Sequence, residues 1–115
     1  MTHYSFRRQA FREVIAHGGE GVVRTSRVAD ADRHQGFNFI DLTEIPPGHS
    51  IGLHRHGMHD EEVYVVVTGC GEMTVNDERT TVYPGDLIVN PAGGVHGLSN
   101  TGSETMRIVV LDVPV

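Results

Sequence analysis

Turn-forming residues divide this chain into short segments, and this division limits its fold more than any other feature. Fourteen glycines are spread along 115 residues, and the dipeptides Asn76-Asp77 and Pro84-Gly85 have the chemistry of tight turns. The segments between the turns are rich in β-branched and aromatic residues, which favour strands over helices. The strands expected on this basis are Val22–Val28, Phe37–Ile45, Glu62–Thr68, Met73–Val75, Thr80–Tyr83, Leu87–Val89, Val95–Ser99 and Met106–Val113.

The pattern predicts an all-β protein, a sandwich or barrel of antiparallel strands. A chain of this length is one domain, and folding can bury about two-thirds of its surface, enough for a core without disulfides. A closed or double-sheet barrel removes exposed sheet edges and can hold one small ligand. Only the N-terminal residues leave two interpretations open. Phe11, Val14 and Ile15 have helical spacing, whereas Phe6–Val14 fits an extended strand equally well.

The net charge and the cysteine content indicate which partners the protein could bind and in which compartment it works. The net charge is −6, and no basic stripe suggests binding to nucleic acid. No apolar run is long enough for a membrane span, and the N-terminus lacks the apolar region of a signal peptide. The single cysteine, Cys70, excludes an internal disulfide framework and is typical of a reducing compartment. We therefore expect a cytoplasmic protein that binds neither nucleic acid nor a membrane.

Histidine is frequent, with eight residues, and two of them share a face. His54 and His56 are two residues apart, so on an extended backbone both point the same way, although two solvated loop histidines would have the same spacing. Parity places Glu62 on the inner face with Tyr64, where a carboxylate is costly unless it is paired or bound to metal. Together with His96, these side chains would suit one divalent transition metal: Fe, Mn, Zn, Ni, Co or Cu. The histidines without metal-binding spacing, which we read as surface residues, are His3, His17, His34 and His49.

At these positions the sequence resembles the cupin family, because both motifs of that family can be read in the chain. The residues that match the first motif are Gly48, His54, His56, Glu62 and Gly69. The residues that match the second motif, at every fixed position and spacing, are Gly85, Pro91, Gly93, His96 and Asn100. The resemblance extends from about Phe37 to Val113 and is to the small single-domain cupins often labelled mannose-6-phosphate-isomerase-like.

The resemblance implies a fold, a metal site and an assembly. Cupins are antiparallel double-sheet jelly-roll β-barrels, so residues 37–113 would form the barrel core of a single domain over residues 1–115, and residues 1–36 would be an N-terminal extension. The ligands that the family uses for one metal ion map onto His54, His56, Glu62 and His96. Small cupins are usually homodimers, and Val22–Val28 is a candidate for exchange into the sheet of a partner.

One departure from the first motif leaves the carboxylate ligand open between two neighbours. Five residues separate His56 from Glu62, where the family pattern has three or four, so counting forward from His56 selects Glu61. Counting back from Gly69 selects Glu62. We favour Glu62, because strand parity is rigid while a loop that contains Gly57 can absorb an insertion.

The function implied by the resemblance is metal-dependent chemistry on a small oxygen-rich metabolite. A metal with three imidazoles and one carboxylate keeps open positions for an anionic or chelating ligand, and it could support dioxygenase-type chemistry or Lewis-acid isomerase or cyclase chemistry. The candidates for a catalytic acid or base are His59, in the loop after His56, and Tyr64. The alternative is a cupin that binds or senses a small molecule without catalysis, because a fold does not determine a function.

Overall fold

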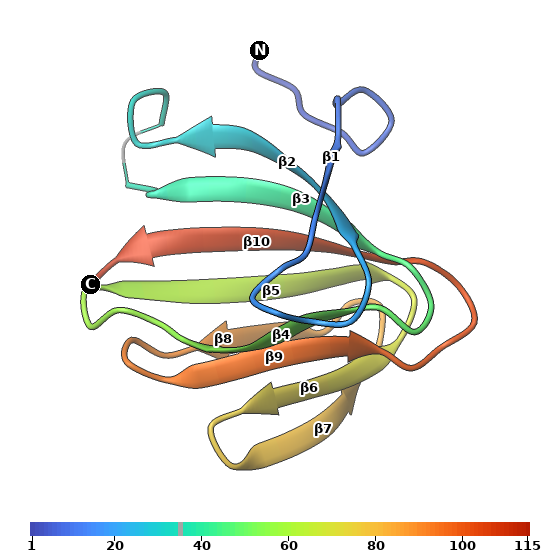
Figure 1. The fold of residues 1–115 in the computed structure, drawn as a ribbon. Coiled ribbons are helices and arrows are strands. Elements are labelled where there is room, and N and C mark those ends of the chain that lie inside the picture. Colours follow the sequence, from blue (N-terminus) through green and yellow to red (C-terminus); the bar gives the residue numbers. More distant parts are fainter. Residues whose placement is uncertain (35) are drawn as a thin grey trace.

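The computed structural model describes residues 1–34 and 36–115, and these residues form ten antiparallel strands (Figure 1). The strands are β1 Arg12–Val14, β2 Val23–Asp30, β3 Phe39–Ile45, β4 Ser50–Arg55, β5 Asp60–Thr68, β6 Gly71–Val75, β7 Glu78–Val82, β8 Leu87–Asn90, β9 Val95–Asn100 and β10 Met106–Pro114. The prediction of an all-β fold is therefore confirmed. In the described part of the chain, no helix is long and apolar enough to cross a membrane.

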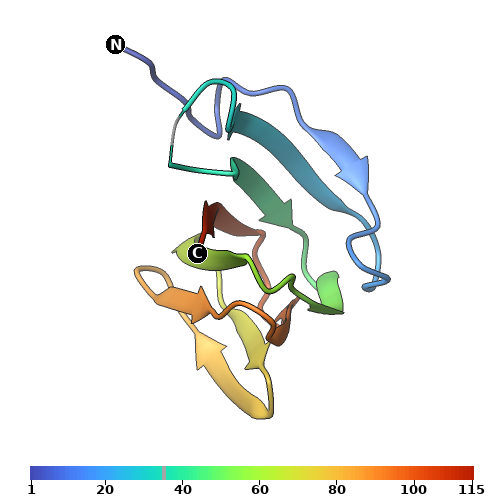
Figure 2. The same ribbon diagram turned by 90° about the vertical axis from the view of Figure 1, so that its left-hand side faces the viewer.

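The strands form two antiparallel sheets, as the jelly-roll prediction requires. One sheet has the order β1-β2-β3-β10-β5-β8 and the other has the order β4-β9-β6-β7. The hairpin of β6 and β7 lies at the opposite side of the molecule from β1 and β2 (Figure 2). Because neighbours in the sheets are distant in the sequence, the fold brings β5 beside β10 and β4 beside β9.

The structure agrees with the two turns predicted at Asn76-Asp77 and Pro84-Gly85. Val75 pairs with Glu78, so Asn76-Asp77 closes the hairpin of β6 and β7, and Asn76 takes a φ of 52°. Gly85 has a φ of 94°, which suits the third position of the predicted turn.

The N-terminal segment is extended at β1, so the helical interpretation of this region is wrong. Pairing with β2 decides the matter, because it satisfies backbone groups that a single helical turn would leave exposed.

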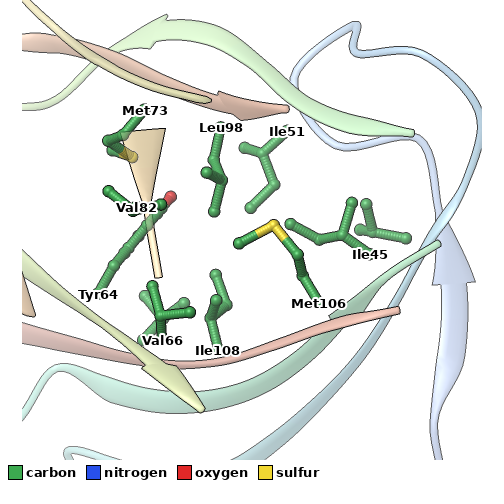
Figure 3. Packing of buried hydrophobic residues seen from close by; sticks show 11 residues of the cluster. Ile45, Ile51, Tyr64, Val66, Met73, Val82, Leu98, Met106 and Ile108 are labelled. Carbon is green, nitrogen blue, oxygen red and sulfur yellow. The ribbon is translucent and has the colours of Figure 1, made fainter. Parts of the chain in front are cut away.

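The core lies between the two sheets and is built from the alternate residues of each strand (Figure 3). Tyr64, Val66 and Ile108 come from the six-stranded sheet, and Met73 and Leu98 face them from the four-stranded sheet. All five are at most 2% exposed. This apolar packing closes the middle of the barrel, so polar inward-facing residues are left to gather at one end.

A β-bulge in β4 determines which of its side chains face inward. Ile51 pairs with Leu98 and His54 pairs with His96, so one extra residue is accommodated between these pairs. Strict alternation would place Ile51 and His54 on opposite faces, whereas the bulge lets Ile51 enter the core and His54 turn to the same interior. The bulge therefore joins the core to the polar end of the barrel.

The segment between β1 and β2 crosses to the other sheet and packs on the bulge (Figure 1). The N–H of Gly52 donates to the carbonyl of Ala16 at 2.9 Å, and the N–H of Ser50 donates to the carbonyl of Glu20 at 2.9 Å. A Cβ on Gly52 would overlap the backbone oxygen of His17, so only glycine allows this approach. The N-terminal extension is thus part of the barrel wall.

The strand proposed for exchange with a partner pairs within its own chain. Arg24 of β2 lies opposite Glu13 of β1 on one side and opposite Glu44 of β3 on the other. The strand β2 thus has neighbours in the same chain along both edges near its start. A partner strand could extend this sheet only at the free edge of β1, at the part of β2 that β1 does not cover, or at the free edge of β8.

Replacing Gly52 with alanine tests the contact between the extension and the bulge. We expect Gly52→Ala to lower the free energy of unfolding by about 1–3 kcal/mol, because the new methyl group overlaps the backbone at His17. Displacement of the segment should also increase the rate of trypsin cleavage after Arg12. The control is Gly48→Ala, which meets nothing within 4 Å but keeps a φ of 78° and should lose only about 1 kcal/mol. Equal cleavage in both variants would contradict the account of this contact.

Candidate metal centre

Four polar side chains converge at one end of the barrel, from both sheets. His54 on β4 and His96 on β9 are paired across the four-stranded sheet, and His56 follows directly after β4. Glu62 comes from β5 of the six-stranded sheet. One ligand atom from each of the four lies within 4.8 Å of the others, and the group can hold a metal ion. The structure thus brings together the four residues that the motifs singled out.

In His54 and in His56, Nδ1 donates a hydrogen bond, which leaves Nε2 available to bind a metal ion. Nδ1 of His54 donates to the carbonyl of Gly52 at 2.8 Å, and Nδ1 of His56 donates to the Asp60 carboxylate at 2.9 Å. In each ring Nε2 then carries the lone pair that a metal ion requires. A carboxylate or carbonyl behind a histidine is the usual way in which proteins orient a metal ligand.

The carboxylate of Glu62 is the point where the imidazoles meet. Its Oε1 lies 3.0 Å from Nε2 of His56 and 3.3 Å from Nε2 of His96. Both ring nitrogens of His96 are buried without a hydrogen-bond partner in the described part of the chain. Such a carboxylate is balanced either by an N–H on one of these rings or by a cation that it shares with the imidazole lone pairs. The donors of this group therefore fit a divalent transition metal of the borderline class.

At neutral pH, His54 and Glu62 are in the protonation states that bind a metal ion. Burial lowers the pKa of His54 to about 4, so its imidazole is neutral at pH 7. Burial by itself would raise the pKa of Glu62, but the adjacent imidazoles of His96 and His56 outweigh burial and lower it. A neutral imidazole and an ionised carboxylate are the forms that bind metal.

The carboxylate that the structure places in the group is Glu62. It is 6% exposed and pairs with Asp112 of β10 and Asn90 of β8. Its neighbour Glu61 is partly exposed and lies opposite Val113. This placement follows the strand parity of β5 rather than the forward count from His56.

The two residues considered as catalytic groups lie in different places. Tyr64 is 2% exposed, and its ring meets the ring of His96 edge-on at 5.4 Å between centroids. Burial raises the pKa of its hydroxyl well above the ordinary value. His59 is exposed in the loop after β4, where its carbonyl accepts from the N–H of Val115 at 3.0 Å. A catalytic role for either residue stays a prediction.

Two further acids lie beside the group and were not anticipated from the sequence. Asp60, Asp112 and His56 also have ligand atoms within 4.8 Å of one another. Asp112 is 1% exposed, and one of its oxygens accepts from the side chain of Asn38 at 2.8 Å. Burial raises the pKa of Asp112 to about 7; the hydrogen bond from Asn38 opposes this, while Asp60 and Glu62 add to it. Alternate residues of β10 face inward, as they do in β5, so the inward position of Asp112 could have been predicted from the sequence.

His17 is exposed, as expected from the sequence, but it also contacts the group. Its ring stacks on that of His54 with 3.5 Å between centroids and 7° between planes. Its backbone has a φ of 53°, which is unusual outside glycine. The position depends on the approach of the N-terminal segment to Gly52, a contact between distant parts of the chain that no motif encodes.

Two cavities meet at this group. A cavity of about 340 Å³ runs from the group toward β1, and a second of about 350 Å³ opens at the barrel end beside Asp60 and Asp112. The residues that line both cavities are His17, Arg27, Phe39, His54 and Glu62. The group is therefore reached by open space from two sides, which permits a ligand to approach it.

Comparisons with known proteins agree with the fold and the motifs. A family model for the cupin domain matches residues 41–113. A protein of Thermotoga maritima named oxalate-binding protein is 28% identical over 98 residues, which are 82% of this chain and 80% of that protein.

Solved structures show the same fold. A structure described as a predicted oxalate decarboxylase from Thermotoga maritima has a TM-score of 0.92 at 22% identity, over 99% of this chain and 100% of that one. A structure described as a putative sugar phosphate isomerase from Acidithiobacillus ferrooxidans has a TM-score of 0.81 at 23% identity, over 100% of this chain and 74% of that one.

The pKa of Asp112 leads to a prediction for the metal-free protein. The folded chain keeps the proton of Asp112 up to about pH 7, whereas the unfolded chain releases it near the ordinary value of 3.8. Between these values the folded state binds more protons, so a rise in pH favours unfolding. The free energy of unfolding of the wild type should therefore fall, relative to that of Asp112→Asn, as the pH rises from about 4 to about 7.

Chemical denaturation of both proteins across this pH range measures the difference. His54 acts in the opposite direction, because its lowered pKa makes the folded state less stable as the pH falls. That contribution is common to the wild type and to Asp112→Asn, so it cancels in the comparison. Parallel profiles of the two proteins would show that Asp112 does not hold its proton in the folded state.

Proposed function

The chain belongs to the cupin family, and on that premise we propose that it is a metalloenzyme for a small, oxygen-rich anionic metabolite. In this proposal His54, His56, Glu62 and His96 hold one divalent transition-metal ion. The observation that carries it is the approach of the Glu62 carboxylate to two imidazole nitrogens, at 3.0 Å and 3.3 Å. A cation at this point would be shared by the carboxylate and by the imidazole lone pairs.

The charge of the loaded site favours an anionic ligand. A divalent ion bound by three neutral imidazoles and one carboxylate keeps a net charge of about +1. Such an ion supplies Lewis-acid polarisation of a bound oxygen, or dioxygen activation if it is iron. A chelating acid would satisfy both the charge and the open positions. The name of the Thermotoga maritima relative, oxalate-binding protein, supports a ligand of this class.

The side chains around the group would orient the ligand and restrict water. Nε and Nη2 of Arg27 donate to the Asp41 carboxylate at 2.9 Å and 3.0 Å, which holds the guanidinium over the ring of Phe39 at 3.9 Å. This fixed planar surface borders both cavities beside Glu62. Tyr64 closes the inner side, and its high pKa keeps the hydroxyl protonated and able to donate a hydrogen bond.

Asp112 is the residue that we propose to hold a proton near the reacting atoms. It is buried beside Glu62, and burial raises its pKa to about 7. A carboxylic acid with such a pKa can exchange a proton at neutral pH, which suits general acid–base chemistry. His59 is the less suitable candidate, because its side chain is exposed in the loop after β4.

The second candidate function is binding without turnover. The printed name of the Thermotoga maritima relative describes binding rather than a reaction. The two functions differ in what happens to the ligand: an enzyme loaded with its metal consumes it, and a binding protein releases it unchanged. Incubation with oxalate under air, followed by carbon NMR and oxygen uptake, separates them for that ligand.

Replacement of the two adjacent glutamates tests the metal site. We expect Glu62→Gln to weaken metal binding by more than the roughly tenfold to hundredfold loss that is typical of an outer partner. Glu61→Gln should leave the affinity unchanged. The double variant His54→Ala/His56→Ala should lose most of the bound metal, since two of four ligands are removed. Elemental analysis and competitive metal titration of the full chain measure these effects.

The opposite order of the two glutamine variants would assign the carboxylate ligand to Glu61. Full metal stoichiometry in the double histidine variant would place the metal elsewhere in the protein. Either result would remove the basis of the proposed function.

We also propose that the chain forms a symmetric dimer. The outer face of the six-stranded sheet is apolar over β10, β5 and β8, with Leu87 62% and Val89 48% exposed. A second copy would cover this surface and the free edge at β8. Light scattering at micromolar concentration should report about twice the chain mass of 12.6 kDa, and a mass equal to one chain would refute the dimer.

A further inference from the structure

We propose that the cavity between the metal centre and β1 selects a chelating acid with an apolar body, larger than oxalate. In this proposal the acid head lies at His54 and Glu62, and the body lies against residues 12–17 of the N-terminal segment. The inference rests on the proposed function, because it assumes that an anion binds at the metal. It adds the class of that anion and the part of the chain that recognises it.

The size of the cavity argues against a ligand as small as oxalate. Its volume is about 340 Å³, which lies within the range of pockets that enclose whole organic metabolites or drug-sized ligands. Oxalate has six non-hydrogen atoms and would occupy only the end of this space. The same cavity is lined by His54 and Glu62 and by Val14 of β1, so a molecule longer than oxalate can reach from the metal to β1.

Half of the residues that line the cavity, eight of sixteen, are apolar. The apolar residues that line it are Val14, Ile15, Ala16, Val23, Phe39, Ile51, Tyr64 and Val110. They come from the N-terminal segment, from β2 and β3, and from β4, β5 and β10. A hydrocarbon or aromatic body would remove this surface from water, which favours binding in proportion to the area covered.

The charged residues of the cavity fit an acid better than a base. Arg27 is paired with Asp41, so these two charges balance each other. Arg12 also lines the cavity, and it has no carboxylate partner among residues 1–34 and 36–115. Glu62 would be neutralised by the metal. The remaining charge of the lined space is therefore positive at the metal and at Arg12.

The wall that faces the body of the ligand is held in place by the fold. Five of the six residues from Arg12 to His17 line the cavity, and the exception is Glu13. Their ends are fixed, because Arg12 pairs with Thr25 in the sheet and the carbonyl of Ala16 accepts from Gly52 at 2.9 Å. Glu13 points to the other face, opposite Arg24. A fixed apolar wall selects ligands by shape without having to order on binding.

Two acids with the same chelating head test the proposal. Pyruvate and phenylpyruvate both present a 2-oxo carboxylate, and only phenylpyruvate carries an apolar body. We expect phenylpyruvate to bind the Mn(II)-loaded full chain at least about tenfold more tightly than pyruvate, because the ring covers the apolar wall. Calorimetry and the change in water proton relaxation by Mn(II) measure both affinities without any need for turnover.

A matched pair of tryptophan variants locates the body. Val14→Trp places a large ring inside the cavity and should abolish the preference for phenylpyruvate while pyruvate binds as in the wild type. Glu13→Trp adds the same ring to the opposite face of the same strand and should keep the preference. Metal stoichiometry and circular dichroism establish that each variant is folded, and the wild-type comparison of the two acids requires no variant.

Each outcome bears on a distinct claim. Equal affinity of the two acids in the wild type would overturn the inference and leave the proposed metal and anion site intact. A preference that survives Val14→Trp would also overturn it, because the body would then lie elsewhere. If Mn(II) binds and neither acid does, the anion part of the proposed function fails, and this inference fails with it.

Discussion

The carboxylate of Glu62 lies between two imidazoles, at 3.0 Å from His56 and 3.3 Å from His96, and the barrel end is built around this contact. Glu62 belongs to the six-stranded sheet, whereas the imidazoles belong to the four-stranded sheet or to the loop that follows it. A buried carboxylate needs a compensating donor or charge, and a cation shared with the imidazole lone pairs would supply it. A bound metal would therefore join the two sheets where the apolar core ends, and metal binding would also stabilise the fold.

The N-terminal extension turns this centre into a site with walls. The bulge in β4 directs both Ile51 and His54 inward, and Gly52 within it allows the backbone of the extension to pack closely. His17 is thereby placed on the ring of His54, and Val14 at the far side of the cavity. A minimal barrel without this segment would hold the same four polar side chains beside open solvent. The extension therefore determines the shape of the space in which a ligand would bind.

The sequence was sufficient for the fold class and for the four converging residues, because both follow from spacing. Strand parity placed Glu62 inward with Tyr64, and the two motifs fixed the histidines. The bulge in β4 was not predicted, because it depends on pairing with β9 rather than on the residues of β4 alone. The stacking of His17 on His54 was not predicted for a similar reason: it depends on a contact between segments that no local pattern links. Asp112 was accessible by parity along β10, and the buried pairing with Glu62 became evident only from the register of β10 with β5.

The central claim is that one metal ion is held by four side chains from both sheets, with a position left open for a ligand. Anomalous diffraction from crystals of the full chain grown with Mn(II) or Co(II) tests it most directly. We expect a single strong peak at bonding distance from His54, His56, Glu62 and His96, with at least one further position filled by water or a small anion. A peak bound instead by His59, by Glu61 or by Asp60 and Asp112, or no peak in metal-saturated crystals, would contradict it.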